Sequence, residues 1–551
     1  MITTRRVMGI ETEFGVLARD ESARAREGAS ASVGHSHHAV AAYALLAEEG
    51  AGKHRVRWDY GDENPLRDAR GFEMQRASAH PTQLTHEVAD AHTPSVDLDA
   101  PVQARECPPE GADADTTLHW AHRHAISNAV LRNGARLYVD HAHPEYSGPE
   151  VMTAREAALY DSAGDEIARR AMEVIAGTDT VAPVVLYKNN TDGKGASYGT
   201  HENYLLAREI PFTEVIAALT PFFVARPVIC GAGRVGIGQK GQDSGYQLSS
   251  RADFFEAEVG LETTLNRPII NTRDEPHALA SEYRRLHVIV GDANTSQFAT
   301  YLKLGITSLV LAALEREHRS GQQILPRIVL ADPVAAMHTV SHDLSLKARL
   351  PLRAGGDVSA LEILSSYLEA VSAHADSADA ETADVLAHWR EILADLPSGG
   401  ARVSDRVEWL AKLNLLQAYR QRGGLDWDAA QLRAIDIQFS DLRRERSLAA
   451  KLAAAGRLRT LFSDDEVARA VTTPPASTRA YLRGELISRY RESVDSAGWD
   501  RICVSGSDGA LRRLSFLRPE WGSREWCAQH AVPLEDGVDA VLSRLAEIAQ
   551  G

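Results

Sequence analysis

Residues 5–15 have the sequence RRVMGIETEFG, in which two glutamates are separated by a single residue within an apolar segment. Alternate side chains of a β-strand point to the same face, so we expect Glu11 and Glu13 on one face and Ile10 and Thr12 on the other. Two carboxylates beside the small residue Gly9 suit divalent cations and a nearby nucleotide, because Mg²⁺ prefers carboxylate and phosphate oxygens. Taken alone, the segment also fits a solvated edge strand that carries acidic residues.

A second strand is predicted near residues 135–141, and residues 136–146 have the sequence RLYVDHAHPEY. Arg136, Tyr138 and Asp140 share its polar face, and two histidines and Glu145 follow directly. A carboxylate pair with an arginine and histidines is typical of a metal–phosphate site that contains a catalytic carboxylate. The alternative is a strand that ends in a charged turn.

Two further strands carry possible ligands. The Gly-rich loop in residues 187–204, YKNNTDGKGASYGTHENY, leads into a strand on which His201 and Asn203 share a face. In residues 284–292, RRLHVIVGD, Arg285 and His287 share a face. Neutral imidazole is a good metal ligand, and the planar guanidinium of arginine binds phosphate oxygens in pairs. Ordinary packed histidines and surface ion pairs are the alternatives.

Two motifs point to other functions. Residues 231–236, GAGRVG, fit the dinucleotide-binding fingerprint, but the loop-like residues after them argue against the helix that this fingerprint needs. His35, His37 and His38 form a possible zinc site, although no cysteine lies near them in the sequence, and solvated histidines are the favoured interpretation.

The order of the predicted elements favours an α+β fold. Strands are expected near residues 5–15, 135–141, 183–188, 201–206 and 285–290, and helices near 36–48, 359–374, 406–421 and 478–491. They show no regular β–α alternation, which argues against a doubly wound sheet. Residues 49–118 are polar and lack periodicity, as is typical of a functional loop or a disordered segment.

Composition narrows the classes of function. The 551 residues carry a formal net charge of −16, whereas nucleic-acid binders normally present a basic face, so no nucleic-acid partner is expected. No apolar run approaches the roughly 18 residues of a membrane span, so no membrane partner is expected. The N-terminal residues contain no signal-peptide core, and the four widely spaced cysteines fit reduced thiols, so the prediction is a cytoplasmic protein.

Taken together, the fragments resemble the Pup ligase/deamidase family. The similarity rests on GIETEFG at 9–15, NGARLYVD at 133–140, KNNTD at 188–192 and IINTRDEPH at 269–277, and it extends over nearly the whole chain. The family has a ligase branch and a deamidase/depupylase branch. The short turn DHAHP at 140–144, the loop GKGA at 193–196 and the long insertion after the first helix are similar to the second branch.

The resemblance implies a glutamine-synthetase-like core with a curved antiparallel sheet in residues 1–475 and a small C-terminal domain in 476–551. It also implies that ATP, acting as a bound cofactor, and Mg²⁺ support deamidation of the C-terminal glutamine of Pup and release of Pup from lysines. Pup, pupylated proteins and a functional link to the bacterial proteasome are the implied partners. A Pup–protein ligase of the same fold and a non-catalytic nucleotide-dependent Pup-binding protein are the alternatives.

The resemblance also assigns residue roles. Asp140 matches the catalytic aspartate, as a base or as a nucleophile. The implied metal ligands are Glu11, Tyr138, Glu145, His201 and His287. The implied nucleotide contacts are Gly9, Ile10, Glu11, Thr12, Glu13, Arg251 and Trp499. Arg226 and Arg234 are possible Pup contacts. We expect residues 57–75 of the insertion to dock transiently near the catalytic groove and residues 76–118 to remain loose.

Overall fold

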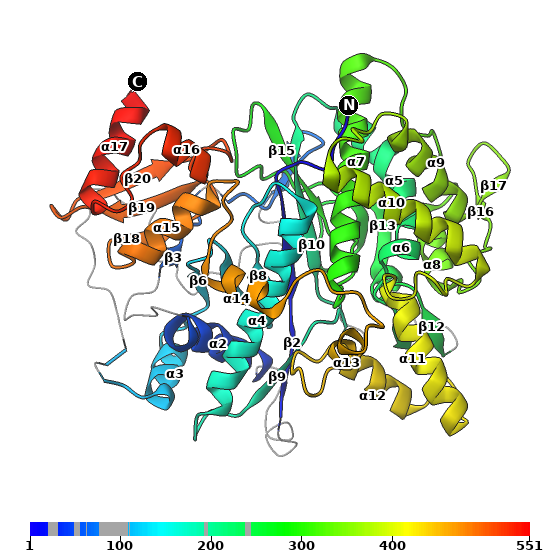
Figure 1. The fold of residues 1–551 in the computed structure, drawn as a ribbon, viewed down its shortest axis with the longest axis horizontal. Helices are drawn as coiled ribbons and strands as arrows, with labels where there is room; N and C mark the ends of the chain where they lie inside the picture. The colour runs from blue at the N-terminus through cyan, green and yellow to red at the C-terminus, as the bar shows by residue number, and fades with distance from the viewer. Residues whose placement is uncertain are drawn as a thin grey trace.

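A computed structural model describes residues 1–19, 31–48, 56–61, 63–75, 108–109, 111–191, 197–236 and 244–550. Its centre is a six-stranded antiparallel sheet in the order β15-β10-β1-β8-β7-β6 (Figure 1). Its strands, in that order, are Tyr283–Val288, Thr200–Ala207, Met8–Glu13, His143–Ser147, Arg136–Asp140 and Asn128–Val130. Antiparallel pairing and the lack of β–α alternation confirm the α+β class.

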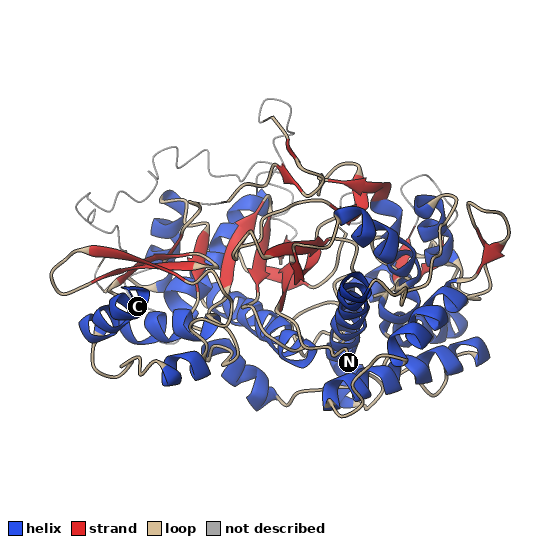
Figure 2. Ribbon diagram, turned by 90° about the horizontal axis from the view of Figure 1, so that it is seen from above, coloured by secondary structure: helices blue, strands red, loops and turns tan. Residues whose placement is uncertain are grey.

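Long helices cover one face of this sheet, and in Figure 2 they lie beneath the strands. They include α2 (Ala31–Ala42), α4 (Ala154–Ala176) and α7 (Gln297–Ser320). A Cβ at Gly164 of α4 would come within 2.4 Å of the Tyr146 ring on β8, so glycine allows this close approach. By length and composition α7 also meets the requirement for a membrane span, but 89% of its most apolar window is buried in the structure.

Further helices, some of which contact α7, form much of the main hydrophobic core. They are α5 (Phe212–Ala225), α6 (Pro227–Cys230), α8 (Pro333–His342), α9 (Ala360–Ser372), α10 (Ala380–Asp395), α11 (Glu408–Gly423), α12 (Ala430–Phe439), α13 (Leu448–Ala454) and α14 (Asp464–Thr472). Ser359 and Glu362 form a capping box at the start of α9. The helices predicted at 359–374 and 406–421 are thereby confirmed to within a few residues.

Short two-stranded sheets complete this part of the molecule. They pair β2 (Gly15–Ala18) with β9 (Val184–Tyr187), β4 (Arg67–Asp68) with β5 (Phe72–Glu73), β11 (Arg234–Gly236) with β12 (Gly245–Gln247), β13 (Phe255–Gly260) with β14 (Arg267–Asn271), and β16 (Leu350–Pro351) with β17 (Asp357–Val358). Gly233 adopts φ +72° and strand β11 follows it. The GAGRVG segment therefore does not begin a helix, in agreement with its rejection as a dinucleotide fingerprint.

A second hydrophobic core lies at the C-terminal end of the chain. It contains α15 (Ala480–Tyr490), α16 (Arg524–Gln529), α17 (Val538–Gln550) and a four-stranded sheet of β20 (Leu511–Ser515), β19 (Arg501–Ser505), β18 (Val494–Ala497) and β3 (Arg57–Trp58). Strand β3 belongs to the insertion, pairs in parallel with β18, and buries Trp58 in this core.

The predicted insertion is only partly irregular in the structure. Helix α3 (Ala114–Arg123) begins before the predicted boundary at 118, with Asp113 as its N-cap. The prediction of a loop to residue 118 is thus wrong at its end, because capping and apolar spacing start the helix earlier. Residues 76–107, most of the stretch predicted to be loose, lie outside the described residues.

Candidate active site

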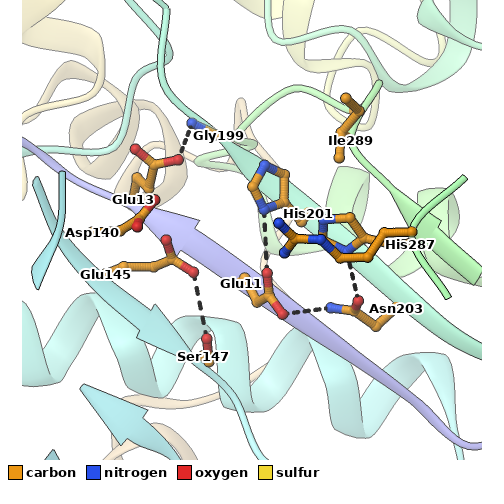
Figure 3. Close-up of polar contacts among 12 residues, drawn as sticks. Glu11, Glu13, Asp140, Glu145, Ser147, Gly199, His201, Asn203, His287 and Ile289 are labelled. Atoms are coloured by element: carbon orange, nitrogen blue, oxygen red, sulfur yellow. Dashed lines mark hydrogen bonds and ion pairs between the residues drawn. The ribbon is translucent and has the colours of Figure 1, made fainter. Parts of the chain in front are cut away.

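One face of the central sheet carries polar side chains from five strands (Figure 3). The antiparallel register places Glu11 opposite His201, Tyr138 opposite Glu145, and Glu13 opposite Glu145. Directly opposed residues have neighbouring side chains. Fragments that lie far apart in the sequence therefore meet on one surface.

Three carboxylates form the first cluster on this face. Glu13, Asp140 and Glu145 each offer an oxygen within 4.8 Å of the others. Glu13 accepts a 2.7 Å hydrogen bond from the Gly199 amide and lies 3.2 Å from His143 Nδ1. Asp140 is the most accessible of the three, with 35% of its side chain exposed. A cluster of oxygen ligands with one open member suits a hard divalent cation and a reacting group.

The second cluster combines Glu11, His201 and His287, whose ligand atoms also lie within 4.8 Å of one another. Glu11 Oε2 lies 3.2 Å from His201 Nδ1, and Glu11 Oε1 accepts a 2.9 Å hydrogen bond from the Asn203 amide. Asn203 Oδ1 lies 2.9 Å from His287 Nδ1. The amide of Asn203 thus orients one carboxylate and one imidazole of the cluster, as residues behind a metal commonly do.

Burial and like charge give Glu145 an unusual environment. Burial and the charges of Asp140, Glu11 and Glu13 raise the pKa of Glu145 well above its ordinary value, and the hydrogen bond from Tyr138 offsets them only partly. The Tyr138 hydroxyl donates that bond at 2.6 Å, and burial and the charge of Glu145 raise the pKa of Tyr138 as well. A divalent cation would relieve this repulsion between carboxylates.

The other three carboxylates remain ionised. Burial opposes ionisation of Asp140, but the His141 hydrogen bond and nearby positive charges lower its pKa. Burial likewise opposes ionisation of Glu13 and Glu11, yet their hydrogen bonds with His143 and His201 leave the pKa of each carboxyl lowered. The two clusters therefore hold one carboxyl that favours its proton among three that do not.

The turn after Asp140 is strained. His141 adopts φ +52°, a conformation that residues other than glycine rarely take. Its Nδ1 lies 3.0 Å from Asp140 Oδ2. On the other side of the turn, Ser36 Oγ of α2 donates to the Ala142 carbonyl at 2.8 Å. The strain is held by these contacts and fixes the orientation of the Asp140 carboxylate.

Two adjoining pockets lie over this face. The polar pocket, of about 1090 Å³, contains both clusters except Glu13, together with Arg273 and Glu275. The apolar pocket, of about 550 Å³, is lined by Gly9, Ile10 and Pro276 among others. Both are lined by Glu11, Ser147, His277, Arg285 and Trp499. A flat apolar ring and a charged tail of one ligand fit such a pair of pockets.

Part of the insertion forms one wall of the polar pocket, which Tyr60 and Glu63 line. The Arg136 guanidinium lies 4.3 Å from the Trp58 ring and 3.9 Å from the Tyr138 ring, and it donates to the Tyr60 hydroxyl at 2.8 Å. The structure therefore places residues 57–75, except the undescribed residue 62, beside the groove where docking was expected.

The structure does not bring every predicted nucleotide contact to the pockets. Thr12 faces α4, where its hydroxyl donates to Asp161 at 3.1 Å, so its side chain cannot reach a ligand on the other face of the sheet. Arg251 is 1% exposed and donates to the carbonyls of Ile289 and Gly291. It lies outside the lining of both pockets, which favours a bracing role in this conformation.

The two arginines considered as Pup contacts are also buried. Arg226 donates to both oxygens of Glu202, at 2.8 and 2.7 Å, and to Thr307 at 2.8 Å. Arg234 is 7% exposed and lies 3.4 Å from Asp253. The suggestion that they contact a protein partner is wrong for Arg226, whose charge is fully used inside the core, and is not supported by the position of Arg234.

Several residues in or beside the pockets and clusters were missed in the sequence. Ser147 follows Glu145 by two positions and shares its face, so strand alternation was a sufficient signal. Gly199 has no space for a side chain, because a Cβ would lie 2.3 Å from the His201 ring. His277 and Glu63 lie in loops, where the sequence has no periodicity that indicates which way a side chain points.

The family described as Pup-ligase protein matches residues 6–503. A protein of Acidothermus cellulolyticus named depupylase is 44% identical, over 94% of this chain and 95% of its own length. One of Mycolicibacterium smegmatis named Pup deamidase/depupylase is 42% identical, over 99% of both chains. A Pup–protein ligase of Acidimicrobium ferrooxidans is 40% identical, over 71% of this chain and 87% of its own.

Solved structures give the same result. The chain resembles the ligase PafA in a crystal structure of its complex with the prokaryotic ubiquitin-like protein Pup, with a TM-score of 0.73, 28% identity and coverage of 99% of this chain and 95% of that chain. It resembles PafA in complex with ADP with a TM-score of 0.67, 32% identity and coverage of 79% and 98%. These likenesses support the expected fold and point to nucleotide binding.

Proposed function

Because the chain belongs to the Pup-ligase protein family, we propose that it is the hydrolytic member, a Pup deamidase/depupylase. It converts the C-terminal glutamine of Pup to glutamate and cleaves the isopeptide bond between Pup and a lysine. Both reactions replace an amide nitrogen on the same γ-carbonyl carbon with oxygen. One site can therefore perform both.

The extent of similarity carries this proposal. The relative named Pup deamidase/depupylase aligns with 99% of this chain, whereas the ligase of Acidimicrobium ferrooxidans aligns with 71%. The insertion, which resembles that of the deamidase/depupylase branch, supports it further, because its residues Tyr60 and Glu63 line the polar pocket. The similarity to PafA structures keeps a ligase as the second candidate.

The residues of the two pockets fit ATP and Mg²⁺. The apolar pocket, with Trp499 and Ile10, suits an adenine ring, and Arg273 and Arg285 suit phosphate oxygens. Glu11, Glu145, His201 and His287 can supply ligands to divalent cations, whereas Tyr138, which keeps its proton, acts as the hydrogen-bond donor to Glu145 instead of the metal ligand that the resemblance implied. When bound, the cation supplies Lewis-acid polarisation of an oxygen atom and offsets the repulsion between the carboxylates.

Asp140 is the catalytic group in this proposal. Its carboxylate is ionised and accessible, so it can accept a proton from an attacking water or attack the amide carbonyl itself. His141 orients it from the strained turn. Arg273 and Arg285 supply fixed positive charge where an oxyanion develops. Tyr138 retains its proton and keeps its hydrogen bond with Glu145.

One assay tests the proposal. Purified protein with Mg²⁺–ATP is given Pup that ends in glutamine, Pup that ends in glutamate together with an acceptor protein, and a Pup–protein conjugate. Ammonia release from the first and Pup release from the third are expected. Conjugation of the second without hydrolysis would show a ligase, and inertness with intact nucleotide binding would show a Pup-binding protein. The proteasome link and cytoplasmic location remain predictions.

A further inference from the structure

A second group of histidines lies outside the catalytic site, where α2 packs against α3 (Figure 1). His35 and His38 are one turn apart on α2, and His119 and His122 are one turn apart on α3. Residues three apart share a helix face, so each helix carries a histidine pair. None of these residues lines either pocket of the active site.

The expectation that the histidines of α2 are solvated is wrong for His35 and for the ring nitrogens of His38. His35 is 8% exposed, and both ring nitrogens of His38 are buried without a hydrogen-bond partner among the described residues. Burial and the neighbouring histidines lower the pKa of His38 to about 4, so its imidazole is neutral and both a donor and an acceptor are unused. Buried polar groups without partners are uncommon in native proteins and need an explanation.

The spacing of two rings supplies one. The ring centroids of His38 and His122 are 5.1 Å apart. Zn–N bonds are about 2.0–2.1 Å, so two imidazoles on one tetrahedral ion have centroids roughly 5 Å apart. His201 and His287, which belong to a candidate metal cluster of the active site, have centroids 4.9 Å apart. The His38–His122 pair thus has the spacing of two ligands of one ion.

We propose that His38 and His122 bind a divalent transition-metal ion of the zinc type, with His35 or solvent completing its coordination. Such ions bind well to imidazole nitrogen, whereas Mg²⁺ prefers oxygen ligands. This site therefore differs in chemistry from the oxygen-rich active site. Without an ion the ligand atoms do not converge closely enough to form a three-ligand group. Small side-chain rotations therefore accompany binding.

The histidine site is connected to the turn after Asp140 through helix α2 and one hydrogen bond. Ser36, two residues before His38, holds the Ala142 carbonyl in the turn that follows Asp140. An ion between α2 and α3 would fix the helix that supports this turn. The proposal itself requires only binding and does not depend on the assignment of the reaction.

Zinc binding by the full chain tests the proposal. Zn²⁺ is titrated against a chromophoric chelator in the presence of saturating Mg²⁺ and ADP, which protect the active site. Wild type is compared with His38→Gln/His122→Gln and with His318→Gln, a control histidine on α7 that is paired only with Glu214. We expect wild type and control to bind one more Zn²⁺ per chain than the double variant, with micromolar or tighter affinity.

Equal zinc stoichiometry in all three proteins would overturn the proposal, and a difference seen only at millimolar Zn²⁺ would mean an adventitious ion only. If the double variant does not fold, Co²⁺ bound to wild type decides. A tetrahedral cobalt spectrum at one equivalent, lost in the single variant His122→Gln, supports the site. A spectrum of octahedral Co²⁺ alone would contradict the proposal.

Discussion

At the scale of single residues, the site separates four carboxylates by environment. Asp140 and Glu145 lie in one cluster, yet the pKa of Asp140 is lowered and that of Glu145 is raised. His141 stabilises the charge of Asp140, whereas Glu145 is buried and faces three like charges. Carboxyls whose environments move their pKa values apart commonly have different roles. Here Asp140 fits a reacting group and Glu145 a metal ligand.

Asp140→Asn should abolish deamidation and depupylation while nucleotide still binds. The amide keeps the shape of the side chain but can neither accept a proton nor attack a carbonyl. The loss should be about 10²–10⁴-fold for a base and larger for a nucleophile. Ammonia release and calorimetric titration with Mg²⁺–ATP measure the two properties. Asp464→Asn, on the surface, is the matched control, and near-normal turnover by Asp140→Asn would exclude a catalytic role.

Glu145→Gln should stabilise the metal-free protein and weaken its affinity for Mg²⁺–ATP. Because the folded-state pKa of Glu145 is raised, wild type loses stability as pH rises from about 4.5 through that higher value. Glutamine removes this loss. Melting temperatures in EDTA should therefore differ more at pH 8 than at pH 5, with the variant higher. A variant that melts below wild type at pH 8 would contradict the charge repulsion, and Glu256→Gln, at an exposed position, controls for the substitution itself.

At the scale of elements, strand alternation predicted correctly which side chains face the site. The one assignment in these strands that failed was made from motif similarity instead. Alternation placed Glu11 with Glu13, and Arg285 with His287, on the faces where the structure has them. Thr12 was assigned to the nucleotide only because it lies inside the motif GIETEFG, although alternation already put it on the other face. Side-chain direction is set by local geometry and is therefore readable from one strand.

In the insertion, by contrast, the sequence did not show which residues pack together. Trp58 and Tyr60 are aromatic residues among charged ones in this segment, but their partners could not be predicted. Trp58 packs 5.0 Å from Trp499, more than 400 residues away in the chain. Such contacts depend on the tertiary arrangement, which local composition does not encode.

Asp68→Asn should loosen the β4–β5 hairpin from residues 272–274, of which Arg273 lines the polar pocket. Asp68 accepts a 2.6 Å hydrogen bond from the Thr272 hydroxyl and pairs with Arg70. Hydrogen bonds to a charged group are worth about 1.5–3 kcal/mol, so local opening should become about tenfold or more frequent. Trypsin cleavage after Arg67 or Arg70 measures it, and the melting temperature of the whole protein should change little.

Asp508→Asn is the matched control for that experiment. Like Asp68, Asp508 pairs with a nearby arginine, Arg512, but it lies on an exposed turn. If Asp68→Asn opens the hairpin and alters turnover of Pup conjugates but not nucleotide affinity, residues 63–75 regulate access. Unchanged proteolysis would show that other contacts hold the hairpin. Loss of all hydrolysis in a folded protein would show that the segment supplies an essential group.

At the scale of the whole molecule, the strand order β15-β10-β1-β8-β7-β6 was not predictable from the sequence. Strands β1, β7, β10 and β15 were found by their own patterns, whereas β6 and β8 were not predicted as strands, and the pairing of β1 with both β8 and β10 joins residues more than 130 positions apart. The expected curved antiparallel sheet came from family resemblance. The sheet of the small C-terminal domain includes strand β3, which no local sequence signal assigns to that domain.

One buried ion-pair group joins the sheet to the C-terminal core. Glu150 Oε1 accepts hydrogen bonds from Arg479 at 2.7 Å and from Arg483 at 3.2 Å. Arg479 also donates to the His277 carbonyl, and Arg483 to the Trp499 carbonyl. Both carbonyls belong to residues that line the two pockets. The joint therefore positions the nucleotide wall as well as the domain.

Glu150→Gln should destabilise this joint and weaken nucleotide binding together. Burial opposes ionisation of Glu150, but Arg483 and Arg479 outweigh it and lower its pKa to about 2, so its contribution to stability is complete above pH 4.5 and is lost as pH falls toward 2. Removing one partner of a buried pair typically costs about 3–5 kcal/mol, because the other charges remain buried. Calorimetric unfolding at pH 7 should show a lower melting temperature, and Mg²⁺–ATP affinity should fall at least tenfold. Glu485→Gln, in a more exposed pair with Arg489 on the same domain, should change neither. Reduced stability with unchanged nucleotide affinity would show that the joint holds the domain but does not position Trp499 and His277.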